Sequence, residues 1–142
     1  MDAEMDDEVQ ELSDLECWEI LRRNELGRLG FHLLDEVHIV PINYVVDADG
    51  LLFRTAEGSK LLGVILNGNV AFEVEEVGAE VARSVVVRGE ARQLDEHEAH
   101  RVEQLPLHNW VPGMRYEVVE IVPKVVTGRE FHLSRPWTHL RP

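Results

Sequence analysis

The sequence predicts a mainly β fold: a barrel of six or seven short antiparallel strands with a few short helices. Apolar and polar residues alternate with a period of two through much of the chain, as half-buried strands require. Turn sequences such as Asp47-Ala48-Asp49-Gly50 separate these runs. Helical patterns are confined to three short stretches. Short strands joined by tight turns favour a barrel that the helices plug.

Length and composition favour one domain. A chain of 142 residues with 44% hydrophobic content can bury a core of its own. We expect residues 1–11 to be a mobile acidic tail, residues 12–133 the domain, and residues 134–142 a C-terminal tail. The formal net charge of −13, with 14 Lys and Arg against 27 Asp and Glu, argues against a nucleic-acid partner.

The cysteine content and the N-terminus indicate a cytoplasmic protein without membrane association. Cys17 is the single cysteine, so no intrachain disulfide or cysteine metal cluster is expected. It lies among apolar positions of the first predicted helix, which indicates a buried structural thiol rather than a nucleophile. The start, residues 1–8, is acidic where a signal peptide would be basic, and no run is long enough to span a bilayer.

The elements follow in order. Ser13 and Glu16 form a capping box that opens a helix running to about Asn24, and its inward stripe is predicted at Leu15, Trp18 and Leu21. Gly89 lies inside a predicted strand and indicates a bulge or a close approach. Another short helix is capped by Asp95 with help from Glu98 and ends at Pro106. The predicted strands are 28–33, 37–46, 51–55, 69–76, 80–92, 115–122 and 125–132, with a helix over 59–67.

The segment Arg54–Leu61 is the strongest candidate for a binding site. It lies between a strand-like and a helix-like run, and amides at a helix N-terminus favour an anion. Thr55, Ser59 and these amides could hold a phosphate, with Arg54 adding a fork of donors and Lys60 a point charge. An ordinary turn with Ser59 as the helix cap and two surface cations explains the same residues equally well.

Other chemical motifs are missing. The sequence contains no GxSxG, GxGxxG or GxxxxGK[ST] pattern, which argues against a serine hydrolase and against standard nucleotide-binding loops. No HxH or HExxH pattern is present either. His97 and His100 lie three residues apart on a predicted helix, and we expect both on its exposed face rather than on a metal. The sequence therefore predicts no metal site.

The order of motifs resembles a known superfamily. Residues 40–44 (VPINY), an acidic turn, residues 51–61 (LLFRTAEGSKL) and residues 67–76 (NGNVAFEVEE) follow one another as in the pyridoxamine 5'-phosphate oxidase-like FMN-binding split barrels, especially small actinobacterial-type members. The resemblance covers roughly residues 11–132. It implies a split β-barrel that acts as a homodimer, with FMN in a cleft between the protomers.

The resemblance also implies site residues. The FMN phosphate would be held by the Arg54 segment, and the flavin ring would lie against the strand that contains Pro41, although Pro41 could also be a simple edge-strand residue. Ser84 and Arg88 fall near a second set of flavin-contacting positions, but a slip of one residue would turn both to the other face. Trp110 corresponds to an aromatic that a neighbouring protomer places at the cleft, or it simply packs its loop. The implied cofactor-binding residues are Val40, Pro41, Ile42, Asn43, Arg54, Thr55, Ser59, Lys60, Ser84, Arg88 and Trp110.

The implied activity is electron transfer through FMN between NADH or NADPH and a small acceptor. Dedicated pyridoxamine phosphate oxidases carry an Arg-rich C-terminal motif that this chain lacks, which argues against pyridoxamine phosphate as the substrate. Relatives that use a deazaflavin or haem leave those cofactors open. No residue is singled out as a catalytic acid or base, so a non-catalytic flavin-binding module also remains open.

Overall fold

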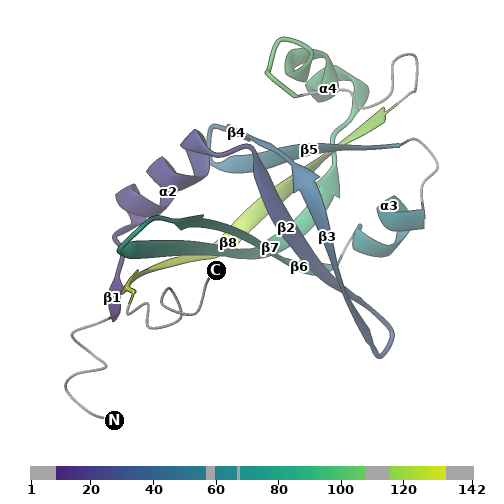
Figure 1. The fold of residues 1–142 in the computed structure, drawn as a ribbon. Helices are drawn as coiled ribbons and strands as arrows, with labels where there is room; N and C mark the ends of the chain where they lie inside the picture. The colour runs from purple at the N-terminus through teal and green to yellow at the C-terminus, as the bar shows by residue number, and fades with distance from the viewer. Residues whose placement is uncertain (1–8, 57–59, 67, 108–115, 134–142) are drawn as a thin grey trace, which may run out of the picture.

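The computed structural model describes residues 9–56, 60–66, 68–107 and 116–133. Within them the chain forms one antiparallel sheet that curls into a barrel, with three helices (Figure 1). The strands are β1 (Val9–Glu11), β2 (Leu26–Leu33), β3 (Glu36–Asn43), β4 (Val45–Asp47), β5 (Gly50–Ala56), β6 (Asn69–Val77), β7 (Val81–Gln93) and β8 (Tyr116–His132). The helices are α2 (Asp14–Arg23), α3 (Lys60–Ile65) and α4 (Glu96–Val102).

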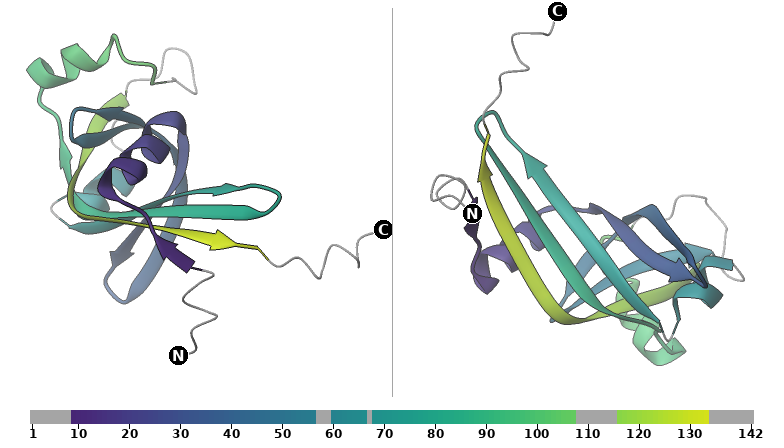
Figure 2. Two further views of the ribbon diagram at one scale, coloured as in Figure 1. Left: turned by 90° about the vertical axis from the view of Figure 1, so that its left-hand side faces the viewer. Right: turned by 90° about the horizontal axis from the view of Figure 1, so that it is seen from below.

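The strand order closes the barrel. Hydrogen-bonded neighbours follow the path β3-β2-β6-β7-β8-β5-β4, and β1 pairs with β8 beside this path. β3 and β4 stand at the two ends of the path, yet only Tyr44 separates them in the chain. Continuing from β3 into β4 therefore joins the two ends of the sheet, and the view along the barrel in Figure 2 shows the resulting ring of strands. The predicted split barrel is confirmed.

The two last predicted strands are one strand, so this part of the prediction was wrong. β8 runs through 17 residues and pairs with β7 along most of its length. The register shifts between Arg88, opposite Val125, and Gly89, opposite Pro123, which leaves Lys124 as the extra residue of a bulge. Pro123 cannot donate to the ladder, and a bulge accommodates it without ending the strand. The irregularity predicted at Gly89 is confirmed.

Three other boundaries differ from the prediction. The strand expected over residues 37–46 is divided at Tyr44 into β3 and β4. The last three residues of the tail expected over residues 1–11 form β1, where Gln10 lies opposite Glu130. The helix expected over residues 59–67 is described from Lys60 to Ile65.

Helix α2 begins as predicted, and two of its three predicted inward residues face the core. The Ser13 hydroxyl accepts from the Glu16 amide at 3.2 Å, and the Glu16 carboxylate accepts from the Ser13 amide at 3.0 Å. Leu21 is buried and Trp18 packs against the core, whereas Leu15 was expected inside but is 68% exposed. The buried residues of α2 are Cys17, Ile20 and Leu21. Cys17 is the buried thiol that the sequence predicted, and desolvation raises its pKa.

The hydrophobic core has two parts. The larger part fills the barrel and includes the fully buried side chains of Leu29, Phe53 and Phe72. The smaller part lies beneath α4 and is a separate cluster. Its buried members are Leu52, Leu94, Val102, Leu107 and Val118. Because Leu52 and Phe53 are neighbours in β5 yet belong to different clusters, both faces of β5 are covered.

Tyr44 fixes the bend that closes the barrel. Its hydroxyl donates to the Leu21 carbonyl at 2.6 Å, and its ring packs edge-on against Phe72 with centroids 4.8 Å apart. We expect Tyr44→Phe to lower the free energy of unfolding by about 1–2 kcal/mol, because the buried carbonyl then loses its donor. Urea unfolding of the two proteins measures this difference, and equal midpoints would contradict it.

Tyr44 should also make stability sensitive to alkaline pH. Burial raises the pKa of its phenol above the ordinary value. Above a pH of about 10 the unfolded chain releases the phenol proton, whereas the folded state keeps it. The contribution of Tyr44 to the free energy of unfolding is therefore fully present below that pH and is lost as the pH rises further. Unfolding curves between about pH 9 and pH 11, a range around the ordinary pKa of tyrosine, measure this effect. As pH rises through this range, Tyr44→Phe should lose less stability than the wild type.

Candidate functional site

The end of β5 carries two of the predicted phosphate residues on opposite faces. Successive side chains of a strand alternate, and Phe53 points into the barrel core. Thr55 therefore shares the inner face and is only 7% exposed. Arg54 shares the outer face with Leu52 and is half-buried, and its Nη1 donates to the Leu107 carbonyl at 3.0 Å. The strand separates the two residues that the sequence prediction placed in one cradle.

The remaining phosphate candidates lie at the start of α3. Lys60 is the first residue of this helix, and three residues separate it from the end of β5 at Ala56. Ser59 lies outside the described residues, as does Trp110.

The predicted ring-contacting residues of β3 point alternately to the inner and the outer face of the sheet. Val40 and Ile42 pack against the barrel core, whereas Pro41 is exposed. Asn43 alternates with Ile42 and follows Pro41 on the outer face. β3 is an end of the strand path and pairs only with β2, where Pro41 lies opposite Arg28. A proline fits such an edge because the missing N–H removes no central ladder bond.

Ser84 and Arg88 both point away from the core. Val85 and Val87 are buried, so the alternation of β7 turns Ser84 and Arg88 to the outer face. The register that the sequence left open is therefore resolved. Arg88 lies between Ala71 of β6 and Val125 of β8. Its side chain is exposed and makes no hydrogen bond or ion pair within the described part of the chain.

A single chain does not bring all these residues together. Arg54 lies opposite Val118 of β8, whereas Ser84 lies opposite Arg129 of the same strand. Eleven residues of extended chain span about 35 Å along the strand. Pro41 lies in β3, three strands from β7, which corresponds to about 14 Å across the sheet. The candidates form separate groups at the two ends of the barrel wall.

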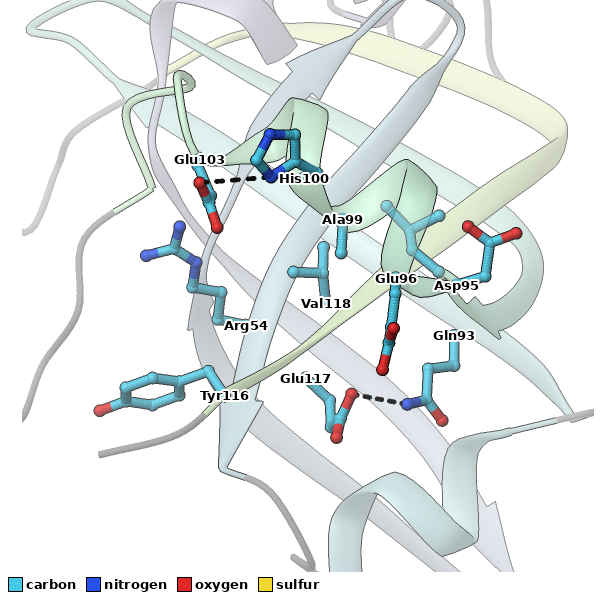
Figure 3. A pocket seen from close by; sticks show the side chains of 11 residues that line it. Arg54, Gln93, Asp95, Glu96, Ala99, His100, Glu103, Tyr116, Glu117 and Val118 are labelled. Atoms are coloured by element: carbon cyan, nitrogen blue, oxygen red, sulfur yellow. Dashed lines mark hydrogen bonds and ion pairs between the residues drawn. The ribbon is translucent and has the colours of Figure 1, made fainter. Parts of the chain in front are cut away.

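A cavity of about 870 Å³ adjoins Arg54 (Figure 3). It opens between α4 and the outer face of β5 and β8, with Leu94, Ala99 and Val118 among its lining. Tyr116 stands near Arg54, and the Gln93 amide donates to the Glu117 carboxylate at 2.7 Å. Four carboxylates line the cavity: Asp95, Glu96, Glu103 and Glu117. Acidic lining disfavours an anion, so this space by itself does not have the charge of a phosphate site.

The acidic cavity depends on α4 for one wall, and α4 is held at its start by a charged cluster. Arg92 bonds Glu98 at 2.7 and 3.1 Å and Glu120 at 2.8 Å. The capping box is also present, with the Glu98 amide donating to Asp95 at 2.7 Å. The hydrogen bond from Arg92 lowers the pKa of Glu98 to about 2.

That shifted pKa gives a prediction for acid. A carboxylate whose pKa is lower in the folded state than in the unfolded chain stabilises the fold. For Glu98 this contribution is fully present at pH values above the unfolded pKa of about 4.3, and it is lost as the pH falls toward 2. Glu98→Gln retains a side chain that suits a capping box but cannot titrate. We expect the wild type to be more stable than Glu98→Gln at pH 7, and the difference to shrink by pH 2.5. A constant difference in urea unfolding would contradict this.

Several features escaped sequence analysis. The bond from Arg54 to Leu107 joins residues 53 apart, and no sequence signal marks it. The acidic cavity likewise combines residues from four elements, β5, β7, α4 and β8. His97 and His100 are exposed as predicted, and the described residues contain no group of His, Cys, Asp and Glu suited to a metal. No helix in the described ranges is long and apolar enough to cross a membrane.

The geometry defines a split-barrel domain with polar candidates on its outer wall. The family described as pyridoxamine 5'-phosphate oxidase matches residues 13–130, and the chain belongs to this family. A FAD-binding protein from Mycobacterium smegmatis is 38% identical, with a TM-score of 0.77 over 87% of this chain and 98% of that one. A putative pyridoxamine 5'-phosphate oxidase from Corynebacterium glutamicum is also 38% identical, with a TM-score of 0.78 over 94% and 98%. An uncharacterized protein of Mycobacterium tuberculosis is 34% identical over 63% of this chain and 83% of its own length.

Proposed function

We propose that this protein binds a flavin nucleotide, FMN, and transfers electrons between NADH or NADPH and a small acceptor. The observation that carries the proposal is the family match over residues 13–130 together with the 38% identity to a mycobacterial FAD-binding protein. A bound flavin would supply the capacity to take up and release electrons. The protein would supply binding, orientation and charge, and we place it in the cytoplasm.

The cations of the site fit an anionic cofactor in part. Arg54 lines the acidic cavity, where its charge offsets only part of the negative charge around it. Lys60 follows β5 closely in the chain, and Arg88 is exposed on the outer wall. The fork of an arginine suits phosphate oxygens, and a lysine adds a point charge. In this proposal Arg54, Lys60 and Ser59 bind the phosphate and the β3 residues border the ring, whereas Thr55 lies on the opposite face of β5 and is left out of the cradle.

The spacing of the candidates supports a site that two protomers share. Arg54 and Ser84 are separated by about 35 Å along β8, which exceeds the length of a mononucleotide. A twofold axis can bring one end of the barrel wall to the other end of its partner. Exposed apolar residues on the outer face favour such pairing, with Ile39 68% and Val125 48% exposed. We therefore propose a homodimer, in which the Ser84 and Arg88 group and Trp110 come from the second protomer.

A cofactor titration tests the proposal. The cofactor-stripped protein would be titrated with FMN, FAD, a deazaflavin and haem, and binding followed by fluorescence and absorbance. We expect stoichiometric FMN binding, followed by NADH or NADPH oxidation that depends on an added acceptor. FMN binding without any turnover would identify a flavin-binding module. Preference for FAD, a deazaflavin or haem would retain the barrel and change the cofactor, and no binding would overturn the proposal.

A further inference from the structure

The hairpin of β2 and β3 extends beyond the rest of the barrel wall (Figure 1). β2 pairs with β6 only from Arg28 to Gly30, whereas its pairing with β3 continues to Leu33. The end of the hairpin is therefore a two-stranded ribbon, and residues 31–39 are called the β2–β3 arm here. Phe31 stacks on His38 across the ribbon, with ring centroids 5.4 Å apart, which stiffens the arm.

The β2–β3 arm exposes apolar side chains that the described part of the chain does not cover. Val37 and Ile39 share the outer face of β3 with Pro41, and both are largely exposed. Leu34, in the turn at the tip of the arm, is 90% exposed. Single exposed apolar residues are ordinary, but a group of them on one projecting ribbon is typical of a contact surface.

The backbone of Leu34 is also strained. Its φ of 53° lies in the left-handed region, which glycine adopts far more readily than leucine. A turn that required only this conformation would be more stable with glycine. The exposed leucine side chain gives the isolated chain no packing in return, so we infer that it packs against another molecule.

The outer wall of β7 and β8 has the complementary chemistry. Arg88 lies on this face, and so does Arg129, since it is directly opposite Ser84. Both arginine side chains are exposed, and neither makes a hydrogen bond or ion pair with the residues that the structure describes. Val86 lies between them along the wall, and Val125 lies opposite Arg88. This wall therefore suits an acidic partner with apolar side chains, although the whole chain has a net charge of −13.

We propose that the β2–β3 arm of one copy of this chain docks on the outer wall of β7 and β8 of a second copy. The turn at the tip of the arm carries Asp35 and Glu36, which supply the negative charge that Arg88 and Arg129 lack. The Glu36 carboxylate lies 3.2 Å from His38 Nε2, and its side chain remains largely exposed. Both halves of the contact lie on the same chain, so a second copy is the partner that fits.

The contact is reciprocal. Under a twofold axis each arm lies on the wall of the other copy, so two equivalent contacts form. Leu34 and Val37 then cover Val86 and Val125, which removes apolar surface on both sides from water. The inference rests on the homodimer of the proposed function and names its interface. Because β3 continues from the arm into residues 40–43, docking brings the wall of the second copy beside the proposed border of the flavin ring.

Analytical ultracentrifugation of the whole chain over a dilution series tests the docking. One double variant is Asp35→Lys with Glu36→Lys, and the other is Arg88→Glu with Arg129→Glu. Each alone should be monomeric where the wild type is dimeric, because like charges then meet in both contacts. An equimolar mixture of the two should form a dimer again, because every contact then joins opposite charges.

The control for charge is Glu19→Lys with Glu103→Lys, which changes the net charge as the first double variant does. Both positions are exposed, on α2 and just after α4, and neither belongs to the arm or the wall. This variant should dimerise as the wild type does. Leu34→Gly tests the apolar contact separately, because glycine relieves the strain at φ 53° and leaves the chain folded. It should raise the dissociation constant of the dimer at least about tenfold.

The outcomes separate this interface from the proposed function. A wild-type dimer that neither charge variant dissociates, or a mixture that does not reassociate, would overturn the interface alone. An unchanged dissociation constant in Leu34→Gly would also count against it. A wild type that is monomeric throughout the series would overturn docking by a second copy together with the shared site. Docking does not require the flavin, so an intact dimer that binds no FMN would overturn the proposed function and leave the interface standing.

Discussion

Alanine at position 89 is expected to lower the free energy of unfolding by roughly 3 kcal/mol. A Cβ built on Gly89 would collide with the backbone carbonyl of Val122, and it would lie 3.1 Å from the Pro123 Cα. These atoms belong to the β8 backbone at the bulge, which pairs with β7 on both sides of the shift. A backbone cannot rotate away as a side chain can, so one of the two strands must move.

Denaturant unfolding of Gly89→Ala measures this loss as a lower midpoint with an unchanged slope. Gly63→Ala is the matched control, because no atom lies within 4 Å of a Cβ at that helical, exposed position. Alanine is favoured over glycine in a helix by up to about 1 kcal/mol, so the control should be as stable as the wild type or slightly more so. Equal stability of the two variants would contradict the close approach at the bulge.

Removal of both proposed phosphate cations should weaken FMN binding by roughly 3–5 kcal/mol. Hydrogen bonds that involve a charged group contribute about 1.5–3 kcal/mol each, and the pair Arg54→Ala and Lys60→Ala removes two such donors. At about 1.4 kcal/mol per factor of ten, the dissociation constant should rise at least a hundredfold. A fluorescence titration with FMN measures it, and circular dichroism confirms that the variant is folded.

The control for this double variant is Arg22→Ala with Arg23→Ala. It removes the same net charge at two exposed positions of α2, a helix that carries none of the proposed site residues. Long-range charge alone would weaken both double variants equally, whereas a phosphate cradle predicts that only the first is affected. Replacing Arg54 also removes its hydrogen bond to the Leu107 carbonyl. The single variant Lys60→Ala leaves that bond in place and therefore reports on the phosphate alone. Unchanged affinity in the Arg54 and Lys60 double variant would remove the phosphate assignment.

Features set by neighbouring residues were predictable. The Ser13 and Asp95 caps each depend on a glutamate three residues later, and both capping boxes are present. The irregularity at Gly89 was also predictable, since glycine inside an apolar strand is unfavourable without a reason of this kind. The order of strands and turns indicated a barrel, and the order of motifs indicated its family.

Features set by register or by distant partners were not predictable. The face of β7 that carries Ser84 and Arg88 depends on register, and a slip of one residue reverses it. In α2 only the packing against the barrel decided that Leu15, predicted inside, is exposed. The distance between the predicted site residues was not predictable either, since Arg54 and Ser84 lie beside positions of β8 that are eleven residues apart.

By itself the sequence determined the β class, the helix caps, the buried thiol and the family, because each of these depends on local pattern or on motif order. Only the tertiary structure decided that Arg54 and Thr55 face opposite sides of β5 and that Arg54 holds Leu107. The physical reason is that a strand alternates its side chains regardless of their chemistry, and each face meets partners that lie far away in the chain.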